Sequence, residues 1–254
     1  MAFIGASAQI PAFVPDWDLP AGVKALQTEC GQGAQPYGGF NLGDHVGDDI
    51  ARVTANRQTL IDAVGVTPVW MRQVHGTRVL ELNDVPSAMP DADAAMTACS
   101  GVACTIMTAD CLPVLVADQQ ARVIGAAHAG WRGLAEGVVE QLIDVMTRVP
   151  GVRPSDLSVW LGPAIGSTAF EVGQDVVDAF VRRDKAHSAS FCPHPTSAGK
   201  YLADLSALAT QVLRTRGVEN IARSELCTYT LTDRFYSFRR ERVTGRMASL
   251  IWLE

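Results

Sequence analysis

The sequence lacks the features that mark membrane, secreted and nucleic-acid-binding proteins. None of its apolar runs approaches the length of a membrane span. No basic residue precedes Lys24, so the charged start of a secretory signal is missing. The formal net charge of −6 argues against a nucleic acid or an acidic membrane as partner. We therefore expect a small-molecule partner, with no nucleic acid and no membrane.

Closely paired cysteines are missing as well. The six cysteines are scattered without a CxxC pair, at Cys30, Cys99, Cys104, Cys111, Cys192 and Cys227. A chain of this length without a secretory signal keeps its thiols reduced rather than forming a disulfide framework. We therefore expect a cytoplasmic protein in which each cysteine needs its own explanation.

Strand-like and helix-like runs alternate irregularly along the chain. The apolar spacing predicts helices over 53–64, 133–149, 175–183 and 203–216, the first capped by Asp48 or Asp49. Strands are predicted over 68–75, 102–107, 157–162 and 245–254, and the stretch 31–49 is predicted to be a loop. Because hairpins mix with helical crossovers, we expect an α+β fold, a single domain over residues 1–254 with mixed β-sheets flanked by helices.

One stretch, 108–133, reads TADCLPVLVADQQARVIGAAHAGWRG and predicts a β-hairpin. With a two-residue loop at Gln119 and Gln120, Cys111 faces His128 directly, and their Cβ atoms lie about 4.5–5.5 Å apart. A bulge at Pro113, which cannot donate a ladder hydrogen bond, would shift this register. The pattern therefore predicts that the thiol and the imidazole share a ligand or a proton.

The turn that follows His128 leads into an amphipathic helix. A helix N-terminus presents free backbone N–H groups and a partial positive charge, which suits an anion. Arg132 lies in this turn, so Arg132 and the amides from Gly130 to Gly133 are the candidates for an anion subsite. Three aromatic residues are candidates for stacking on a base, namely Trp131, Tyr236 and Phe238.

His75, in the stretch QVHG, is the third candidate of the site. It is predicted to end a strand, and Gly76 after it clears space for a ligand. Two histidines and one cysteine suit zinc with an open fourth position. The same three residues would equally suit a cysteine nucleophile with a histidine base. Asp110, beside Cys111, is a candidate general acid or base, or a hydrogen-bond partner that holds a ligand histidine.

The other polar candidates have default interpretations as structural or solvated residues. His45 is interpreted as a loop residue and His187 as solvated. The stretch CPH at 192–194 resembles a metal motif but lies in a polar loop without a second pair. Arg57, Arg239 and Arg240 are interpreted as surface charges.

With these residues in view, the chain resembles a known family. The motifs that carry the resemblance follow in order along nearly the whole chain: FNLGDHVGDD, QVHG, DADA, MTADCLPVL, AAHAGWRGL, LGPAIG, FEVG, CTY, FYSFRRE and TGRMASLIWL. They resemble the purine nucleoside phosphorylase family once called multicopper polyphenol oxidases, or laccase-domain proteins. TADCLP and HAGWRG at this spacing are highly specific, and the chain is especially similar to the bacterial peptidoglycan editing factor.

The resemblance implies a metal site, usually zinc with copper as the alternative, held by His75, Cys111 and His128. It implies a single α+β unit with a mixed-sheet core. It also implies phosphorolysis of adenosine, inosine and methylthioadenosine, and deamination of adenosine. One departure stands out, because the family's Thr-Arg-x-Gly-Gly turn is replaced here by QTECGQGAQPY, which has no arginine.

Three further functions compete with the purine nucleoside enzyme. One, which the similarity to the peptidoglycan editing factor implies, is an amidase that edits a UDP-linked cell-wall precursor, UDP-MurNAc carrying L-serine. Zinc hydroxide or a Cys111 thiolate would attack the amide. Another is a copper-dependent polyphenol oxidase. A blue-copper centre needs two histidines and a cysteine, but a trinuclear centre needs many more imidazoles than the five histidines present. The last is a non-catalytic metal-binding protein. The sequence leaves the physiological substrate and the oligomeric state open.

Overall fold

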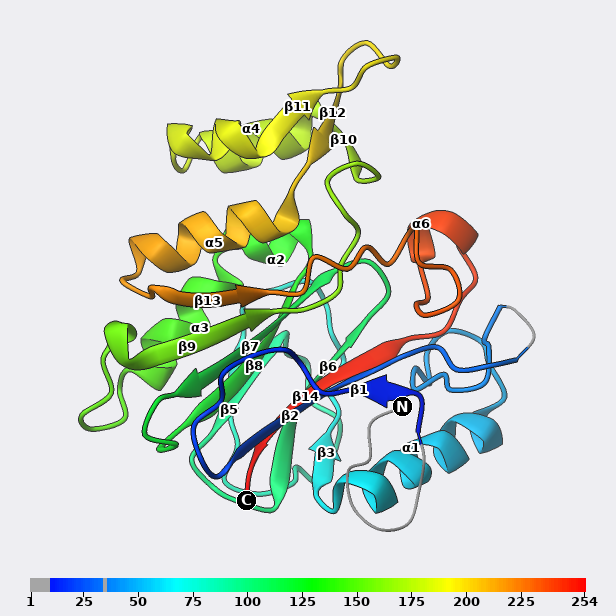
Figure 1. Cartoon of the computed structure of the whole chain (residues 1–254), viewed down its shortest axis with the longest axis vertical. Coiled ribbons are helices and arrows are strands. Elements are labelled where there is room, and N and C mark those ends of the chain that lie inside the picture. The colour runs from blue at the N-terminus through cyan, green and yellow to red at the C-terminus, as the bar shows by residue number, and fades with distance from the viewer. Residues whose placement is uncertain (1–9, 34–35) are drawn as a thin grey trace.

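Two mixed sheets packed face to face form the centre of the molecule (Figure 1). The computed structural model describes residues 10–33 and 36–254. The first sheet runs in the order β1 (Ala12–Phe13), β2 (Val23–Thr28), β14 (Met247–Leu253), β6 (Val102–Thr108) and β3 (Thr67–Val69). The second runs in the order β13 (Asn220–Arg223), β9 (Leu157–Leu161), β7 (Leu112–Asp118), β8 (Ile124–Ala129), β5 (Ala94–Thr97) and β4 (Val79–Glu81).

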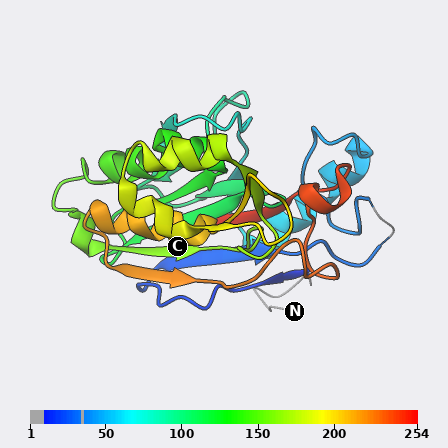
Figure 2. The same ribbon diagram turned by 90° about the horizontal axis from the view of Figure 1, so that it is seen from above.

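Helices cover the outer faces of both sheets, which confirms the α+β fold with mixed sheets flanked by helices. The helices are α1 (Ile50–Val64), α2 (Trp131–Glu136), α3 (Val138–Met146), α4 (Gln174–Val181), α5 (Leu205–Thr215) and α6 (Phe238–Glu241), with 3₁₀ turns at η1 (Pro154–Asp156) and η2 (Lys185–Ser190). A small third sheet of β10 (Glu171–Gly173), β12 (Lys200–Ala203) and β11 (Phe191–Pro193) lies beside α4, as Figures 1 and 2 show. Within the described ranges, no helix has the length and apolarity to cross a membrane.

Strand β7 shows how the apolar sequence specifies these layers. Its side chains alternate between the two faces of the sheet. Val114 and Val116 pack with α3 and α5 on one face, and Leu115 and Ala117 pack against the other sheet on the opposite face. All four are fully buried. Burial of each large aliphatic side chain contributes about 1.5–3 kcal/mol, so the strand is fixed between the layers and its N-terminal end is held firmly.

The hairpin of β7 and β8 forms, but the predicted register is wrong by two residues. Pro113, not Cys111, is opposite His128. The loop is longer than predicted because the carboxylate of Asp118 accepts hydrogen bonds from the backbone N–H groups of Gln120 and Arg122. A shift of two residues keeps the same face, so Cys111 still lies diagonally across from His128, just before β7 begins.

Two other predicted elements differ in extent. The strand predicted over 68–75 ends at Val69, because the chain leaves β6 there and the backbone of the QVHG segment turns toward Asp93. The helix predicted over 133–149 is split into α2 and α3 at Gly137, whose φ of 104° is left-handed and breaks the helical path. In contrast, α1 begins as predicted at its cap, since the Asp49 side chain accepts from the Ala51 N–H.

Three polar residues that were interpreted as solvated or surface residues are buried or half-buried instead. His187 is 6% exposed, and its Nδ1 lies 3.1 Å from the Phe180 carbonyl oxygen, so it is a structural histidine and not a solvated one. Arg57 packs over the Trp70 ring at 4.2 Å, and Arg240 donates to the carbonyl oxygens of Thr228 and Phe235. These arginines hold loops together rather than forming a solvated surface.

Candidate metal centre and adjoining pocket

Three side chains from separate parts of the chain meet at the end of the β7–β8 hairpin. His75, Cys111 and His128 each offer one ligand atom, and these atoms all lie within 4.8 Å of one another. Cys111 precedes β7, His128 is in β8, and His75 is in the loop after β3. The rings of His75 and His128 meet edge to face, with centroids 4.7 Å apart. The structure thus brings together the three residues that the sequence suggested.

Asp93, just before β5, holds both histidines in place, and sequence reasoning gave it no role. Its Oδ1 lies 2.8 Å from Nδ1 of His128. The carboxylate also accepts from the backbone N–H groups of Val74, His75 and Gly76, at 2.7–3.1 Å. Burial raises the pKa of Asp93, but the hydrogen bonds from His128 and Gly76 outweigh it and lower the pKa. Asp93 therefore fixes the backbone that carries one histidine and the ring of the other.

The thiol and the imidazole of the centre form a coupled pair. Burial raises the pKa of Cys111, but the charge and the hydrogen bond of His128, with the hydrogen bond of His75, lower it to about 6. Burial lowers the pKa of His128, but the charge of Cys111 and the hydrogen bond to Asp93 raise it to about 9. The lowered pKa of Cys111 favours its thiolate, which is the form that binds a metal.

The donor set and its spacing fit one tetrahedral transition metal. Typical Zn–S and Zn–N bonds place a sulfur and a nitrogen ligand about 3.6 Å apart, and Cys111 Sγ lies 3.7 Å from Nε2 of His75. The contact of Nδ1 with Asp93 leaves Nε2 of His128 for the metal, which is the usual carboxylate–histidine–metal arrangement. His75, Cys111 and His128 therefore fit a zinc or copper ion with a fourth position open.

Two glycines of the HAGWRG turn make this close approach feasible. A Cβ at Gly130 would lie 2.7 Å from Cδ2 of His75 and 3.0 Å from Sγ of Cys111. A Cβ at Gly133 would lie 3.0 Å from the carbonyl oxygen of Gly76. Both glycines are buried behind the ligands. Their role in the structure is to give the ligands room.

A cavity of about 240 Å³ opens beside the three ligands. It is lined by His75, Ala109, Asp110, Cys111, Trp131, Arg132, Ile165, Phe170, Leu205, Phe238, Arg239 and Arg242. Of the predicted anion turn, Trp131 and Arg132 line the cavity and the two glycines do not. Arg239, interpreted from the sequence as a surface charge, is half-buried in this wall.

Backbone strain is concentrated around this cavity. Positive φ angles are uncommon for residues other than glycine and often mark functional sites. Five such residues occur in the described chain, and three of them line the cavity, namely His75 at 61°, Asp110 at 95° and Arg242 at 61°. The local chain is therefore held in unfavourable conformations where the ligands and the pocket wall meet.

Asp110 is the carboxylate that lines the cavity, and both of its oxygens are engaged. Oδ1 accepts from Thr228 Oγ1 at 2.7 Å, and Oδ2 accepts from Ser237 Oγ at 3.1 Å and from the Arg239 N–H at 2.6 Å. The histidine-holding role that the sequence allowed for Asp110 is filled by Asp93. Asp110 instead connects the chain beside Cys111 to the segment that carries α6.

The aromatic candidates separate by burial. Tyr236 is fully buried, and its hydroxyl donates to the carbonyl oxygen of Cys30 at 3.0 Å, so it packs inside and cannot stack on a ligand. Phe238 is 45% exposed and lines the cavity. Trp131 is half-buried in the same wall, with the Arg132 guanidinium 4.3 Å from its ring centroid.

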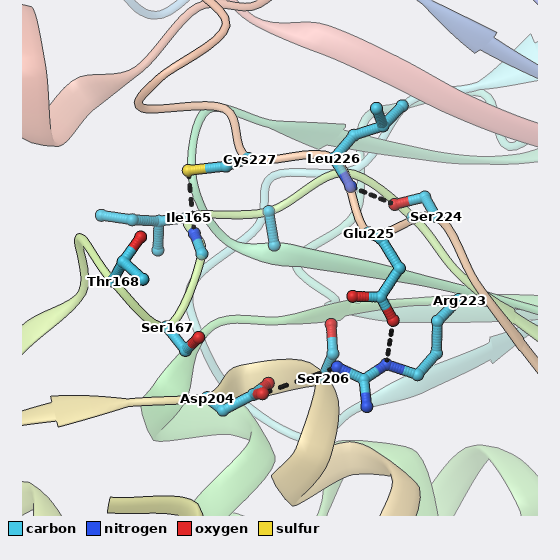
Figure 3. Close-up of a pocket in the computed structure, with 13 residues that line it drawn as sticks. Ile165, Ser167, Thr168, Asp204, Ser206, Arg223, Ser224, Glu225, Leu226 and Cys227 are labelled. Atoms are coloured by element: carbon cyan, nitrogen blue, oxygen red, sulfur yellow. Dashed lines mark hydrogen bonds and ion pairs between the residues drawn. The ribbon is translucent and has the colours of Figure 1, made fainter. Parts of the chain in front are cut away.

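Figure 3 shows a second hollow, of about 180 Å³. Ile165 lines both this hollow and the first. Its charged groups are paired with one another. Arg223 lies 3.5 Å from an Asp204 oxygen and 3.1 Å from a Glu225 oxygen. Cys227 Sγ accepts the Gly166 N–H at 3.2 Å. No group of three metal-ligating side chains lies here within the part of the chain that the structure describes.

The fold and the site define a protein with one candidate His₂Cys metal centre beside a cationic pocket. The chain belongs to the family described as multi-copper polyphenol oxidoreductase laccase, which matches residues 24–254. In the described residues the candidate ligands form one group of three, fewer than a multicopper centre requires. Of the other histidines, His187 contacts Phe180, and His194 lies 3.5 Å from Glu171.

Several proteins that are similar to this chain over nearly their whole length have names more specific than the family description. A protein of Pseudomonas aeruginosa named purine nucleoside phosphorylase is 46% identical, with 94% of this chain and 97% of that protein covered. Purine nucleoside phosphorylase YfiH of Escherichia coli is 45% identical, over 94% and 98%. The crystal structure of protein NMB0706 of Neisseria meningitidis is similar to this structure, with a TM-score of 0.91 and 43% sequence identity. The match covers 96% of this chain and 99% of that one.

Proposed function

We propose that this protein is a metal-dependent purine nucleoside enzyme that catalyses the phosphorolysis of adenosine, inosine and methylthioadenosine, and the deamination of adenosine. The observation that carries the proposal is the meeting of His75, Cys111 and His128 at the wall of a pocket that also contains arginines and an exposed aromatic ring. The names of the relatives at 45–46% identity support the same reaction class.

Each group of residues in the pocket has a proposed role. His75, Cys111 and His128 would hold zinc, with copper as the alternative, and a bound zinc supplies a Lewis acid and acidifies a water ligand. Asp93 keeps the Nε2 of His128 directed at the metal position. Phe238 and Trp131 offer ring faces to a purine. The buried apolar side chains of Ile165 and Leu205 in the pocket wall would help to exclude bulk water from the reacting atoms.

Arg132 is the proposed contact for the phosphate nucleophile. It lines the cavity, it is exposed, and no carboxylate of the described residues lies within 4.0 Å of it. A guanidinium offers a planar fork of donors that matches a phosphate. Asp110 is the proposed general acid or base, although its three hydrogen bonds equally suit a residue that positions the pocket wall.

The proposal is tested by incubating zinc-loaded protein with a panel of purine nucleosides, with and without phosphate, and analysing the products by mass spectrometry. Phosphorolysis predicts free base and ribose-1-phosphate only when phosphate is present. Deamination predicts inosine from adenosine in both conditions. A Cys111→Ser variant prepared in parallel controls for contaminating enzymes, because it should form neither product. Absence of both products from the zinc-loaded protein would refute the proposal.

A further inference from the structure

The arginines of this protein fall into two groups. Eleven of them lie within 4.0 Å of a carboxylate oxygen. The others have no such partner among the described residues, and Arg132, Arg239 and Arg242 of this second group line the cavity beside the candidate metal centre. In a chain of net charge −6, three arginines without a carboxylate partner beside one carboxylate, Asp110, give this cavity an excess of positive side chains that favours an anionic ligand.

Arg239 is the most firmly fixed of these cavity arginines. Its backbone N–H donates to Asp110, and its Nη1 donates to the Glu171 carbonyl oxygen at 2.8 Å. Its guanidinium carbon lies 5.3 Å from the Phe170 ring centroid. Neither Nε nor Nη2 donates to any residue that the structure describes. The side chain is therefore held in position with part of its donor fork unused, which is the arrangement that favours oxyanion binding.

Arg242 brings a second guanidinium to the same wall. It follows α6 with a φ of 61°, and its guanidinium carbon lies 5.8 Å from the ring centroid of Phe238. The guanidinium carbon of Arg246 lies 5.9 Å from the same ring centroid. The exposed ring of Phe238 is thus accompanied by two cations, so a ligand that binds beside this ring meets positive charge.

These arginines belong to a different wall from Arg132. Arg132 is in α2, while Arg239 and Arg242 come from α6 and the residue after it, and Figure 1 shows the two helices apart. One phosphate carries about 1.5–2 negative charges at neutral pH. A single phosphate at Arg132 would leave the guanidinium groups of Arg239 and Arg242, which have no carboxylate within 4.0 Å in the described chain, without an anionic ligand.

We propose that Arg239 and Arg242 form a second anion subsite, which binds a phosphoester group carried by the substrate itself. The pocket then binds a nucleoside monophosphate in preference to the nucleoside. This proposal rests on the proposed function for the nucleoside part of the ligand. The phosphoester lies on the α6 wall, and Arg132 stays free for inorganic phosphate.

The test is isothermal titration of the zinc-loaded full chain with inosine and with inosine 5′-monophosphate, without phosphate so that phosphorolysis cannot proceed. The monophosphate should bind at least about tenfold more tightly than inosine, the effect expected of one charge-assisted contact. In Arg239→Met and Arg242→Met this preference should fall to about threefold or less. Arg239→Lys keeps the positive charge but loses the planar guanidinium donors, so its preference for the monophosphate should lie between those of the wild type and Arg239→Met.

Arg214→Met is the matched control, because Arg214 is also exposed and without a carboxylate partner in the described chain but lies in α5, away from the cavity lining. It should keep the full preference. A second set of titrations uses Arg132→Met. The monophosphate preference should survive this substitution if the phosphoester lies on the α6 wall, and its loss would mean that Arg132 holds the phosphoester and would overturn the proposal.

The two proposals fail in different ways. If the wild-type protein binds the monophosphate no more tightly than inosine but releases ribose-1-phosphate, the second subsite is refuted and the proposed function stands. If the preference is present and depends on Arg239 while no nucleoside is turned over, the proposed function is refuted and the anion subsite stands. Circular dichroism of each variant separates loss of binding from loss of fold.

Discussion

Two hollows of similar size share Ile165 in their linings, but they differ in how their polar groups are partnered. The hollow around Cys227 is about 180 Å³ and the one around Cys111 is about 240 Å³. In the first, Arg223 is paired with Asp204 and Glu225, and the thiol is partnered by a backbone N–H. In the second, the cavity arginines have no carboxylate within 4.0 Å in the described chain, and the thiol lies against two imidazoles.

The two hollows differ in whether their polar and charged side chains have partners within the protein. A polar group that has found its partner within the protein contributes to folding and needs no ligand. A cluster of ligand atoms, unpaired guanidinium groups and strained backbone costs free energy unless something outside the chain compensates it. We therefore assign chemistry to the hollow at Cys111 and a structural role to the hollow at Cys227, and the following experiments test this contrast.

The largest effect is expected at the metal ligands. His75→Ala, Cys111→Ala and His128→Ala each remove one of three protein ligands, so each should lose most of about one zinc per chain while the protein stays folded. Cys227→Ala, in the neighbouring hollow, is the control and should keep its metal. Elemental analysis with circular dichroism measures both quantities. Full zinc occupancy in Cys111→Ala would remove Cys111 from the site.

A smaller effect is expected from one added methyl group behind the ligands. Gly130 has φ and ψ of −63° and 158°, which alanine adopts without strain. Its Cβ would nevertheless lie 2.7 Å from His75 and 3.0 Å from Cys111. Such overpacking costs about 1–3 kcal/mol, so Gly130→Ala should weaken zinc binding about fivefold to more than a hundredfold.

Gly76→Ala is the matched control for that substitution. A Cβ at Gly76 meets its nearest neighbours at 3.6 Å, which is an ordinary contact. It should therefore leave the zinc dissociation constant, measured by chelator competition, within about twofold of the wild-type value. Equal losses in the two variants would show that the loss at position 130 does not come from the close contact with the ligands, and that clearance for the ligands is not why glycine stands there.

Part of the arrangement around the hollow at Cys111 could be predicted from the sequence. The pattern of β7 and β8 was enough to bring Cys111 and His128 to one face, because a register error of two residues preserves the face. The register itself depended on how the Asp118 carboxylate caps the loop, which a residue pattern does not reveal. The sequence pattern did not reveal that the helix predicted over 133–149 divides at Gly137, because the stripe of apolar residues continues through both α2 and α3.

Asp93 and Arg239 were missed for a different reason. Their roles depend on contacts across 35 residues to His128 and 129 residues to Asp110, which no local spacing encodes. A signal for Asp93 did exist. A ligand histidine normally donates from its second ring nitrogen to a carboxylate, and Asp93 stands directly before the apolar residues Ala94, Ala95 and Met96. Arg239 offered no comparable signal, since an unpaired arginine is recognised only when its surroundings are known.

A moderate and selective effect is expected at Arg132. Arg132→Met should raise the apparent KM for phosphate about tenfold to a hundredfold, since one charge-assisted contact contributes roughly 1.5–3 kcal/mol. Deamination of adenosine uses no phosphate and should fall much less. Ribose-1-phosphate formation against phosphate concentration and inosine formation without phosphate are measured on one preparation. Equal losses in both assays would mean that Arg132 supports the fold or the metal, and its phosphate role would be abandoned.

The smallest effect is expected at Arg223, the paired arginine of the neighbouring hollow. Its side chain is 33% exposed and its partners are Asp204 and Glu225. Partly exposed ion pairs contribute about 0.2–1 kcal/mol, so Arg223→Met should lower the free energy of unfolding by no more than about that amount. The KM values for nucleoside and phosphate should not change, because this guanidinium is already compensated within the protein. Urea unfolding and steady-state kinetics give the two numbers. A tenfold rise in either KM would show that both hollows belong to one substrate site. It would contradict our assignment of a structural role to the hollow at Cys227.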